Sequence, residues 1–206
     1  EEQTRESQIQ LALERVRART MAMQHSAELP EAANLLFQQM QALGMPAWSA
    51  GYCIWKDDKK AVTLWMSSEG VLQPPFEAPT TEDELFIEMR RGHEQGKSLH
   101  VIEMGGQKLN AHYAYMRTLP VVGEIFDSIL EAGHPLPAYQ VMHYAYFSKG
   151  YLLFITYEPV PQAHPVFIRF ASVFDQTYTR FLDLKRAEEQ AREAQIEVAV
   201  ERVRAK

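Results

Sequence analysis

The spacing of apolar residues changes along the chain and separates helical from extended segments. In residues 1–25, apolar side chains recur every three or four positions, which is the period of a helix that buries one face. The same period predicts helices between Pro30 and Gly44, over about 82–94, over 107–118 and 121–132, and from about Pro165 onward. Segments rich in aromatic and β-branched residues predict strands at 47–55, 61–67, 98–104, 139–147 and 151–157.

Four of these strands form two predicted hairpins. The charged tip at 56–60 joins the first pair, and the turn Ser148-Lys149-Gly150 joins the second. The resulting order is helix, hairpin, helix, strand, helices, hairpin and long helix. This order predicts the α+β class, with an antiparallel sheet that carries helices on one face and is flanked by long N- and C-terminal coiled-coil helices.

The final helix changes character near Leu184. Before that residue it carries an aromatic stripe that must pack on the domain, made of Phe167, Phe170, Phe174, Tyr178 and Phe181. After it, acidic and basic residues are balanced and large apolar residues become sparse. A helix this polar is marginal in water on its own, which favours pairing with a second copy over a solitary solvated helix.

The two ends of the chain carry nearly the same peptide. Residues 5–18 and 192–205 are identical at ten of fourteen positions. A helix repeated on either side of a non-repeated middle suggests one module of a longer relay, in which the same connector leads into each module. The apolar seams of the two copies predict a homodimeric coiled coil. The seam residues are Ile9, Leu13, Val16, Ile196, Val200 and Val203.

A second apolar stripe overlaps the C-terminal seam. It runs through Leu184, Ala187, Ala191, Ala194 and Val198, again at spacings of three and four. Two seams on one helix predict two pairings of similar energy, which is the bistable element that a switch needs.

Composition narrows the class of protein. A net charge of -6 over 206 residues, without a basic patch, argues against a general nucleic-acid binder. Cys53 is the only cysteine, so an intrachain disulfide is impossible. Since nothing resembles a secretory signal, we expect a cytoplasmic location. No apolar run approaches the roughly 20 residues that span a bilayer, so we expect no direct membrane contact.

The motifs of common enzyme and metal sites are missing. The chain has no GxSxG, no phosphate-binding loop, no HExxH and no CxxC, so we expect neither catalysis nor a metal centre. Cys53, between Tyr52 and Ile54 on a strand, is typical of a small core residue rather than a nucleophile. A haem-binding sensor with His100, His112 or His143 as axial ligand is an alternative to ordinary surface or core histidines.

The order of elements resembles a GAF domain, the small-molecule and chromophore sensor of many signalling proteins. The peptide E-R-V-R-A-R-T-M-A-M at 14–23 is similar to connectors of bacterial multidomain sensors, such as cyclases and the histidine kinases of two-component systems. The resemblance implies a connector helix at 1–27, a GAF-like domain at 28–180 and a second connector helix at 181–206. The Asn-Lys-x(n)-Phe-x3-Asp-Glu pattern of cyclic-nucleotide-binding members is absent, and Cys53 lies mid-strand rather than near the pocket helices where bilins attach. The ligand, and any cofactor, therefore stays unknown.

In GAF-like folds the pocket lies between the sheet and the helices that join the middle strands. By that resemblance the candidate pocket residues are Trp65, His112, Tyr115 and His143. The expected function is a non-catalytic sensory or regulatory module of a signal-transduction protein. It would bind a small molecule and relay a change through a dimeric coiled coil to an output domain. A ligand-free dimerisation scaffold is the alternative, and an enzyme acting on a small molecule is the third.

Overall fold

The computed structural model describes residues 2–204 and has a mixed α+β fold built on one antiparallel sheet. The strands are β1 (Ala47–Trp55), β2 (Ala61–Ser68), β3 (Val71–Leu72), β4 (Phe76–Pro79), β5 (Leu99–Gly105), β6 (Tyr139–Phe147) and β7 (Gly150–Thr156). They lie in the order β3-β2-β1-β7-β6-β5, and β4 pairs with the other end of β2.

Six α-helices surround the sheet. They are α1 (Glu2–Met21), α2 (Glu31–Ala42), α3 (Glu84–Glu94), α4 (Gly106–Thr118), α5 (Val122–Glu131) and α6 (His164–Arg204). Short 3-10 helices at Ser26–Glu28 and Pro161–Ala163 precede α2 and α6. Within residues 2–204, no helix is both long enough and apolar enough to span a bilayer.

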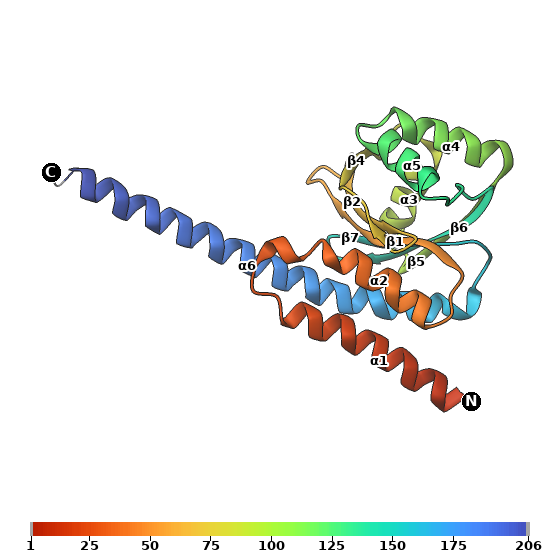
Figure 1. Ribbon diagram of the computed structural model, residues 1–206, viewed down its shortest axis with the longest axis horizontal. Helices are drawn as coiled ribbons and strands as arrows, with labels where there is room; N and C mark the ends of the chain where they lie inside the picture. The colour runs from red at the N-terminus through yellow and green to blue at the C-terminus, as the bar shows by residue number, and fades with distance from the viewer. Residues whose placement is uncertain (1, 205–206) are drawn as a thin grey trace.

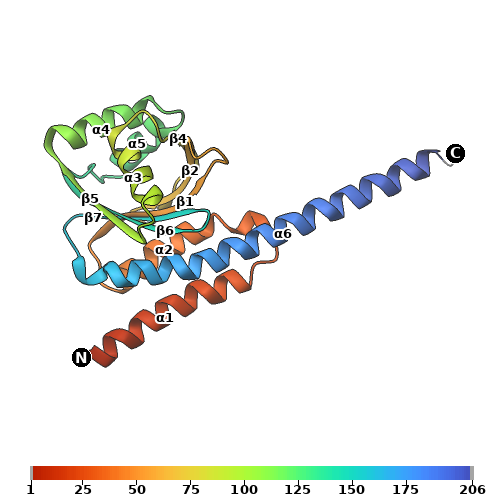
Figure 2. The same cartoon turned by 180° about the vertical axis from the view of Figure 1, so that it is seen from behind.

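The helices cover both faces of the sheet rather than the one face expected from the sequence (Figure 1). Helices α3, α4 and α5 lie on one face, whereas α2 and the first half of α6 (residues 164–184) lie on the other (Figures 1 and 2). The reason is that the central strands are apolar on both sides: every residue of β7 is buried. A strand with two apolar faces needs cover on each.

Two hydrophobic cores result, one on each side of the sheet. The first joins α1, α2 and α6 to residues such as Ala145 and Phe154. The second joins α3, α4 and α5 to residues such as Tyr144 and Leu153. Neighbours along β6 and β7 therefore belong to opposite cores, as the alternation of side chains in a strand requires.

Most predicted elements are confirmed, with two differences. The five long strands and both hairpins occur within about one residue of their predicted bounds. Strands β3 and β4 lie in the proline-containing segment 67–81, which reads as a loop in sequence. With two and four residues, they are too short to show a periodic pattern in the sequence, and each pairs only with β2.

Helix α1 packs on its own domain instead of standing free. Ile9, Leu13 and Val16 are 7%, 4% and 1% exposed and belong to the core with α2 and α6. The seam that the sequence assigns to a dimer is therefore, for these three residues, a contact within the chain. Helix α1 and the domain that follows it thus share one hydrophobic core.

Polar contacts hold α1 in place and fix its direction. The Arg5 guanidinium donates to the Leu43 carbonyl at 2.7 Å, and Glu6 pairs with Arg169 at 2.8 Å. At the other end His25 lies 3.8 Å from Glu188, so α1 runs parallel to α6. Figure 1 shows the two helices side by side.

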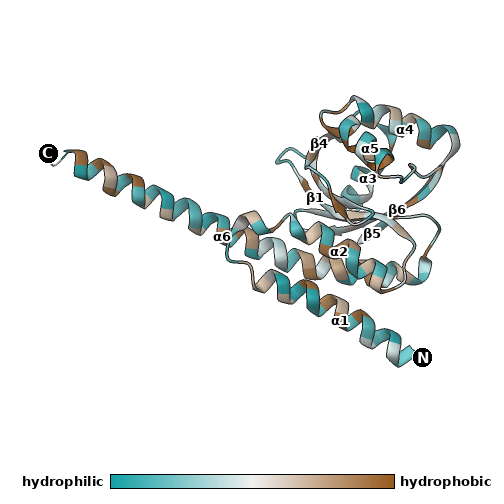
Figure 3. Cartoon of the chain, viewed as in Figure 1, coloured by the Kyte–Doolittle hydropathy of each residue, from teal (hydrophilic) through white to brown (hydrophobic). Residues whose placement is uncertain are grey.

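The second half of α6 (residues 185–204) projects beyond the body of the domain (Figures 1 and 2). Its surface is mostly hydrophilic, with apolar residues returning toward its end (Figure 3). Ile196, Val200 and Val203 are 54%, 41% and 76% exposed. The apolar face of the repeated peptide is thus buried in the first copy and exposed to solvent in the second.

Candidate functional site

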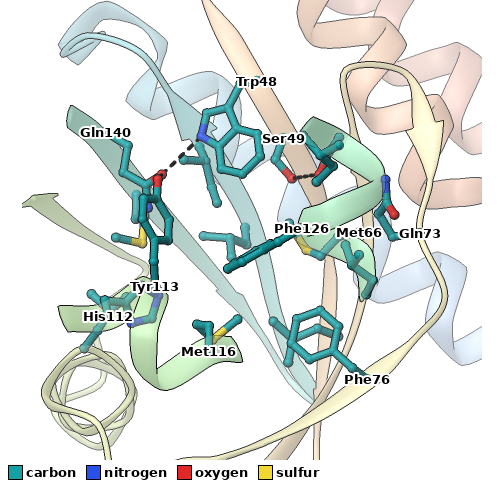
Figure 4. A pocket seen from close by; sticks show the side chains of 18 of the residues that line it. Trp48, Ser49, Met66, Gln73, Phe76, His112, Tyr113, Met116, Phe126 and Gln140 are labelled. Atoms are coloured by element: carbon teal, nitrogen blue, oxygen red, sulfur yellow. Dashed lines mark hydrogen bonds between the residues drawn. The ribbon is translucent and has the colours of Figure 1, made fainter. Parts of the chain in front are cut away.

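A cavity of about 80 Å³ lies between the sheet and helices α3, α4 and α5. Figure 4 shows side chains from the sheet and from the helices converging on it. Helices α4 and α5, which connect β5 to β6, line the cavity opposite the sheet. Its walls are mainly apolar, with a few polar side chains at defined positions.

A β-bulge turns Trp48 toward the cavity. Opposite β7 the register shifts between Ala47 and Ser49, so that one extra residue of β1 is accommodated. Ala47 and Ala50 belong to the core with α2 and α6, whereas Trp48 and Ser49 both line the cavity. Without the bulge, alternation would send Trp48 to the same face as Ala50.

Gln140 is the polar centre of one wall. Its side-chain oxygen accepts from Trp48 Nε1 at 3.2 Å and from the Tyr113 hydroxyl at 3.0 Å (Figure 4). The same hydroxyl lies 2.9 Å from the Pro137 carbonyl. Gln140 is an uncharged amide and is 2% exposed, and burial raises the pKa of Tyr113, so its hydroxyl stays protonated. The wall can orient a ligand by hydrogen bonds without placing a charge beside it.

His112 enters the cavity wall from α4 and is held by Asp83. The Asp83 carboxylate lies 3.0 Å from His112 Nδ1 and also accepts from the Leu85 backbone N–H at 3.1 Å. Asp83 is therefore the N-cap of α3. One carboxylate thus links α3 to α4 and satisfies a helix terminus at the same time.

The remaining walls are apolar. Helix α5 contributes Ile125, Phe126 and Ile129, which share one face at spacings of one and three. Tyr144 and Leu153 contribute from the sheet. The spacing of α5 in the sequence predicts its buried face, but only the packing of α5 over the sheet makes that face a cavity wall.

The four candidate pocket residues do not form one site. His112 lines the cavity, but Tyr115 lies further along α4, with its hydroxyl donating to Glu82 at 2.8 Å. Trp65 stacks on Tyr52 at 5.1 Å between ring centroids, on the face covered by α2 and α6. His143 also lies on that face. Successive residues of a strand point to opposite faces of the sheet. Trp65 and His143 point to the face covered by α2 and α6, whereas the cavity lies on the other face.

His143 is buried beneath the start of α6. Its Nε2 lies 3.0 Å from the Thr156 hydroxyl, which donates to the Glu158 carbonyl at 2.7 Å, so Nε2–H is the donor. Its Nδ1 has no hydrogen-bond partner among residues 2–204. Burial, assisted by the neighbouring His164 ring, lowers the pKa of His143 to about 3. The imidazole is therefore neutral and packs against Phe167 at 4.8 Å.

Neither the haem alternative nor a cysteine nucleophile fits this arrangement. His143 is separated from the cavity by the sheet, and His100 lies outside it, 3.2 Å from Glu88. A cavity of about 80 Å³ is too small for a porphyrin ring unless α3, α4 and α5 move off the sheet. Cys53 is fully buried, and burial raises the pKa of its thiol. In the described part of the chain, no three His, Cys, Asp or Glu side chains are grouped so that they could hold a metal ion.

Comparison with known proteins assigns no family to the chain. No family model matches it, and no curated protein is significantly similar to it. Function is therefore inferred from the cavity, the sheet and the different surroundings of the two copies of the repeated peptide.

Proposed function

We propose that the chain is a non-catalytic sensory or regulatory module with a GAF-like fold. A small apolar molecule in the cavity would change how α6 packs on the opposite face of the sheet. The observation that carries the proposal is the course of α6. This single helix of 41 residues packs on the sheet with its first half and projects from the domain with its second.

Only the sheet separates the cavity from α6. On β7, Leu153 lines the cavity, while its neighbour Phe154 stacks on Phe167 of α6 at 4.4 Å between ring centroids. On β6, Tyr144 lines the cavity, and its neighbour His143 contacts the same Phe167. A ligand that displaces these strands must therefore also displace the aromatic face of α6, because close-packed interiors transmit strain.

The second half of α6 is the proposed output element. A continuous helix passes on a tilt, rotation or shift over its whole length, here roughly 60 Å at 1.5 Å per residue. We propose that it leads to an output domain of a cytoplasmic signal-transduction protein of the two-component type, and that two copies pair through its projecting part. Nucleic acid and membrane are not among the proposed partners.

A ligand-free dimerisation scaffold is the second candidate, and the small volume of the cavity favours it. Thermal unfolding with benzene, toluene and indole as probes separates the two. A probe at one hundred times its Kd raises the stability of the folded state by about 2.7 kcal/mol. We expect at least one probe to raise the Tm of the natural chain.

The matched control is Ile129→Phe, which places a larger side chain in the cavity wall. This variant should lose the probe-dependent rise in Tm while remaining folded, since overpacking typically costs about 1–3 kcal/mol. If no probe raises the Tm, or if the variant responds as the natural chain does, the sensory proposal fails and the scaffold is favoured.

A further inference from the structure

The projecting part of α6 carries the same docking face that α1 uses. The buried apolar residues of α1 are Ile9, Ala12, Leu13 and Val16. Shifted by 187 positions, they correspond to Ile196, Ala199, Val200 and Val203, all of which are exposed. The second copy thus exposes to solvent the apolar face that the first copy buries in the core.

The polar docking contacts are retained as well. Arg5 and Glu6 fasten α1 to the Leu43 carbonyl and to Arg169, and their counterparts are Arg192 and Glu193. We define the docking surface as the part of α2 and α6 that α1 covers, together with Leu43 and Arg169. The second copy has every group with which α1 makes these contacts.

The differences between the copies fall mainly on the outer face of α1. Residues 1–19 and 188–206 are identical at thirteen of nineteen positions. Four of the six differences occur where α1 is exposed, at Thr4, Ser7, Gln10 and Leu11. The other two are conservative, Leu13 against Val200 and Arg19 against Lys206. Three of the four buried apolar positions of α1 are identical in the second copy, and the fourth keeps a branched aliphatic side chain.

We infer that residues 188–204 are the first helix of a second domain with this architecture, and that they bind its docking surface as α1 binds here. The docking surface of another copy of this chain is the less suitable target, because its own α1 already covers it. That α1 is joined to α2 by a short segment, and its effective concentration is of millimolar order. The docking surface that residues 188–204 bind must therefore belong to a domain that has no other first helix.

In this arrangement α6 is an element of two hydrophobic cores. Its first half is buried in one domain, and its last turns are buried in the next, so a change in the first core moves a helix that the second core contains. Leu184 packs against the core of this domain, but the later residues of the second apolar stripe, Ala194 and Val198, stay on the outer side. Val198 corresponds to Leu11, which is 53% exposed although α1 is docked. Pairing between chains is thus assigned to this stripe rather than to Ile196, Val200 and Val203.

The first test exchanges the sequence of the two copies within the full chain. The variant Ser7→Ala/Gln10→Glu/Leu11→Val/Leu13→Val makes residues 5–18 identical to 192–205. We expect a fall in Tm of a few degrees at most, and amide exchange of residues 5–18 within about tenfold of the natural chain. Adding Ile9→Asp to this variant is the control, and it should abolish the protection. Loss of protection in the fourfold variant itself would overturn the inference.

The second test supplies a docking surface that lacks its own helix. Residues 19–206 are joined directly after Ala205 of the full chain, so that 192–205 is the only first helix available to the second domain. Amide exchange of residues 192–204 should slow roughly a hundredfold relative to the single chain. Ile196→Asp should unfold the second domain of this tandem, while the same substitution in the single chain leaves its Tm unchanged.

Two outcomes would contradict docking onto a following domain. In the first, residues 192–204 exchange equally fast in the tandem and in the single chain. In the second, Ile196→Asp lowers the Tm of the single chain in a manner that depends on protein concentration, which would mean that the segment binds another copy instead.

Discussion

The same substitution in the two copies of the repeated peptide should have very different effects on stability. Val16 and Val203 occupy equivalent places in the identical segment E-R-V-R-A. Val16 is 1% exposed in the core with α2 and α6, whereas Val203 is 76% exposed. Truncation of each to alanine therefore compares a buried with an exposed side chain in one local sequence.

The expected magnitudes follow from burial. Val16→Ala removes two methyl groups worth about 0.8 kcal/mol each and leaves a small void, so it should cost about 2 kcal/mol. Val203→Ala removes exposed surface and introduces a better helix former, so its effect should lie within about 0.5 kcal/mol. For a protein of this size, the difference corresponds to a Tm lower by roughly 4–8 °C for Val16→Ala alone.

Urea unfolding and calorimetry, each at two protein concentrations, measure this difference. Equal losses in the two variants would refute the reasoning, because they would place both valines in similar surroundings. No loss for Val16→Ala would show that α1 does not pack on the domain in solution. A loss for Val203→Ala that grows with protein concentration would reveal pairing through that face.

Three further predictions test the sheet, the junction of α4 and α5, and the buried histidine. Gly150→Ala would place a Cβ 1.8 Å from the Cys53 carbonyl oxygen, so soluble expression should be lost, whereas Gly123→Ala, with its nearest neighbour at 3.7 Å, should express normally. Val121→Gly should raise the free energy of unfolding by about 1 kcal/mol, since a β-branched residue at φ +75° is strained; a lower value in urea unfolding would contradict this. His143 has its pKa lowered from 6.5 to about 3, so the unfolded chain gains a proton below pH 6.5 that the folded chain does not, and stability falls toward acid. Between pH 7 and pH 5, the free energy of unfolding should fall by about 2 kcal/mol less in His143→Gln than in the natural chain. Equal falls in the two proteins would refute the lowered pKa of His143.

The elements were predictable because their periodicity is local. The strands at 47–55 and 139–147 are rich in aromatic and β-branched residues, and these segments form β1 and β6 with the expected bounds. The cavity was not predictable residue by residue, because its composition depends on which helices cover which face. His143 and Tyr144 are adjacent, yet only Tyr144 lines the cavity.

Trp48 illustrates a second limit. Alternation along β1 places it with Ala50, and only the bulge opposite β7 turns it into the cavity. A bulge depends on the register of two strands distant in sequence, so it leaves no signal in β1 alone. Gln140 gives a weak signal, because it is a polar residue near the start of a mainly apolar strand.

The seam of α1 was ambiguous for a different reason. Ile9, Leu13 and Val16 have the spacing of a coiled coil, but a helix that packs on its own domain has the same spacing. Sequence distinguishes a buried from an exposed face, not an internal from an external partner. The structure assigns the internal partner to the first copy of the peptide, and so makes the exposed second copy informative.

The central claim is that occupancy of the cavity changes the packing of α6. Amide exchange across residues 164–184 tests it most directly, with and without a saturating concentration of the probe that raises the Tm most, and with Ile129→Phe as the control that does not respond. We predict that this probe changes exchange in the segment severalfold in the natural chain and leaves it unchanged in the variant. Protection confined to α3, α4 and α5, with α6 unaltered, would contradict the account.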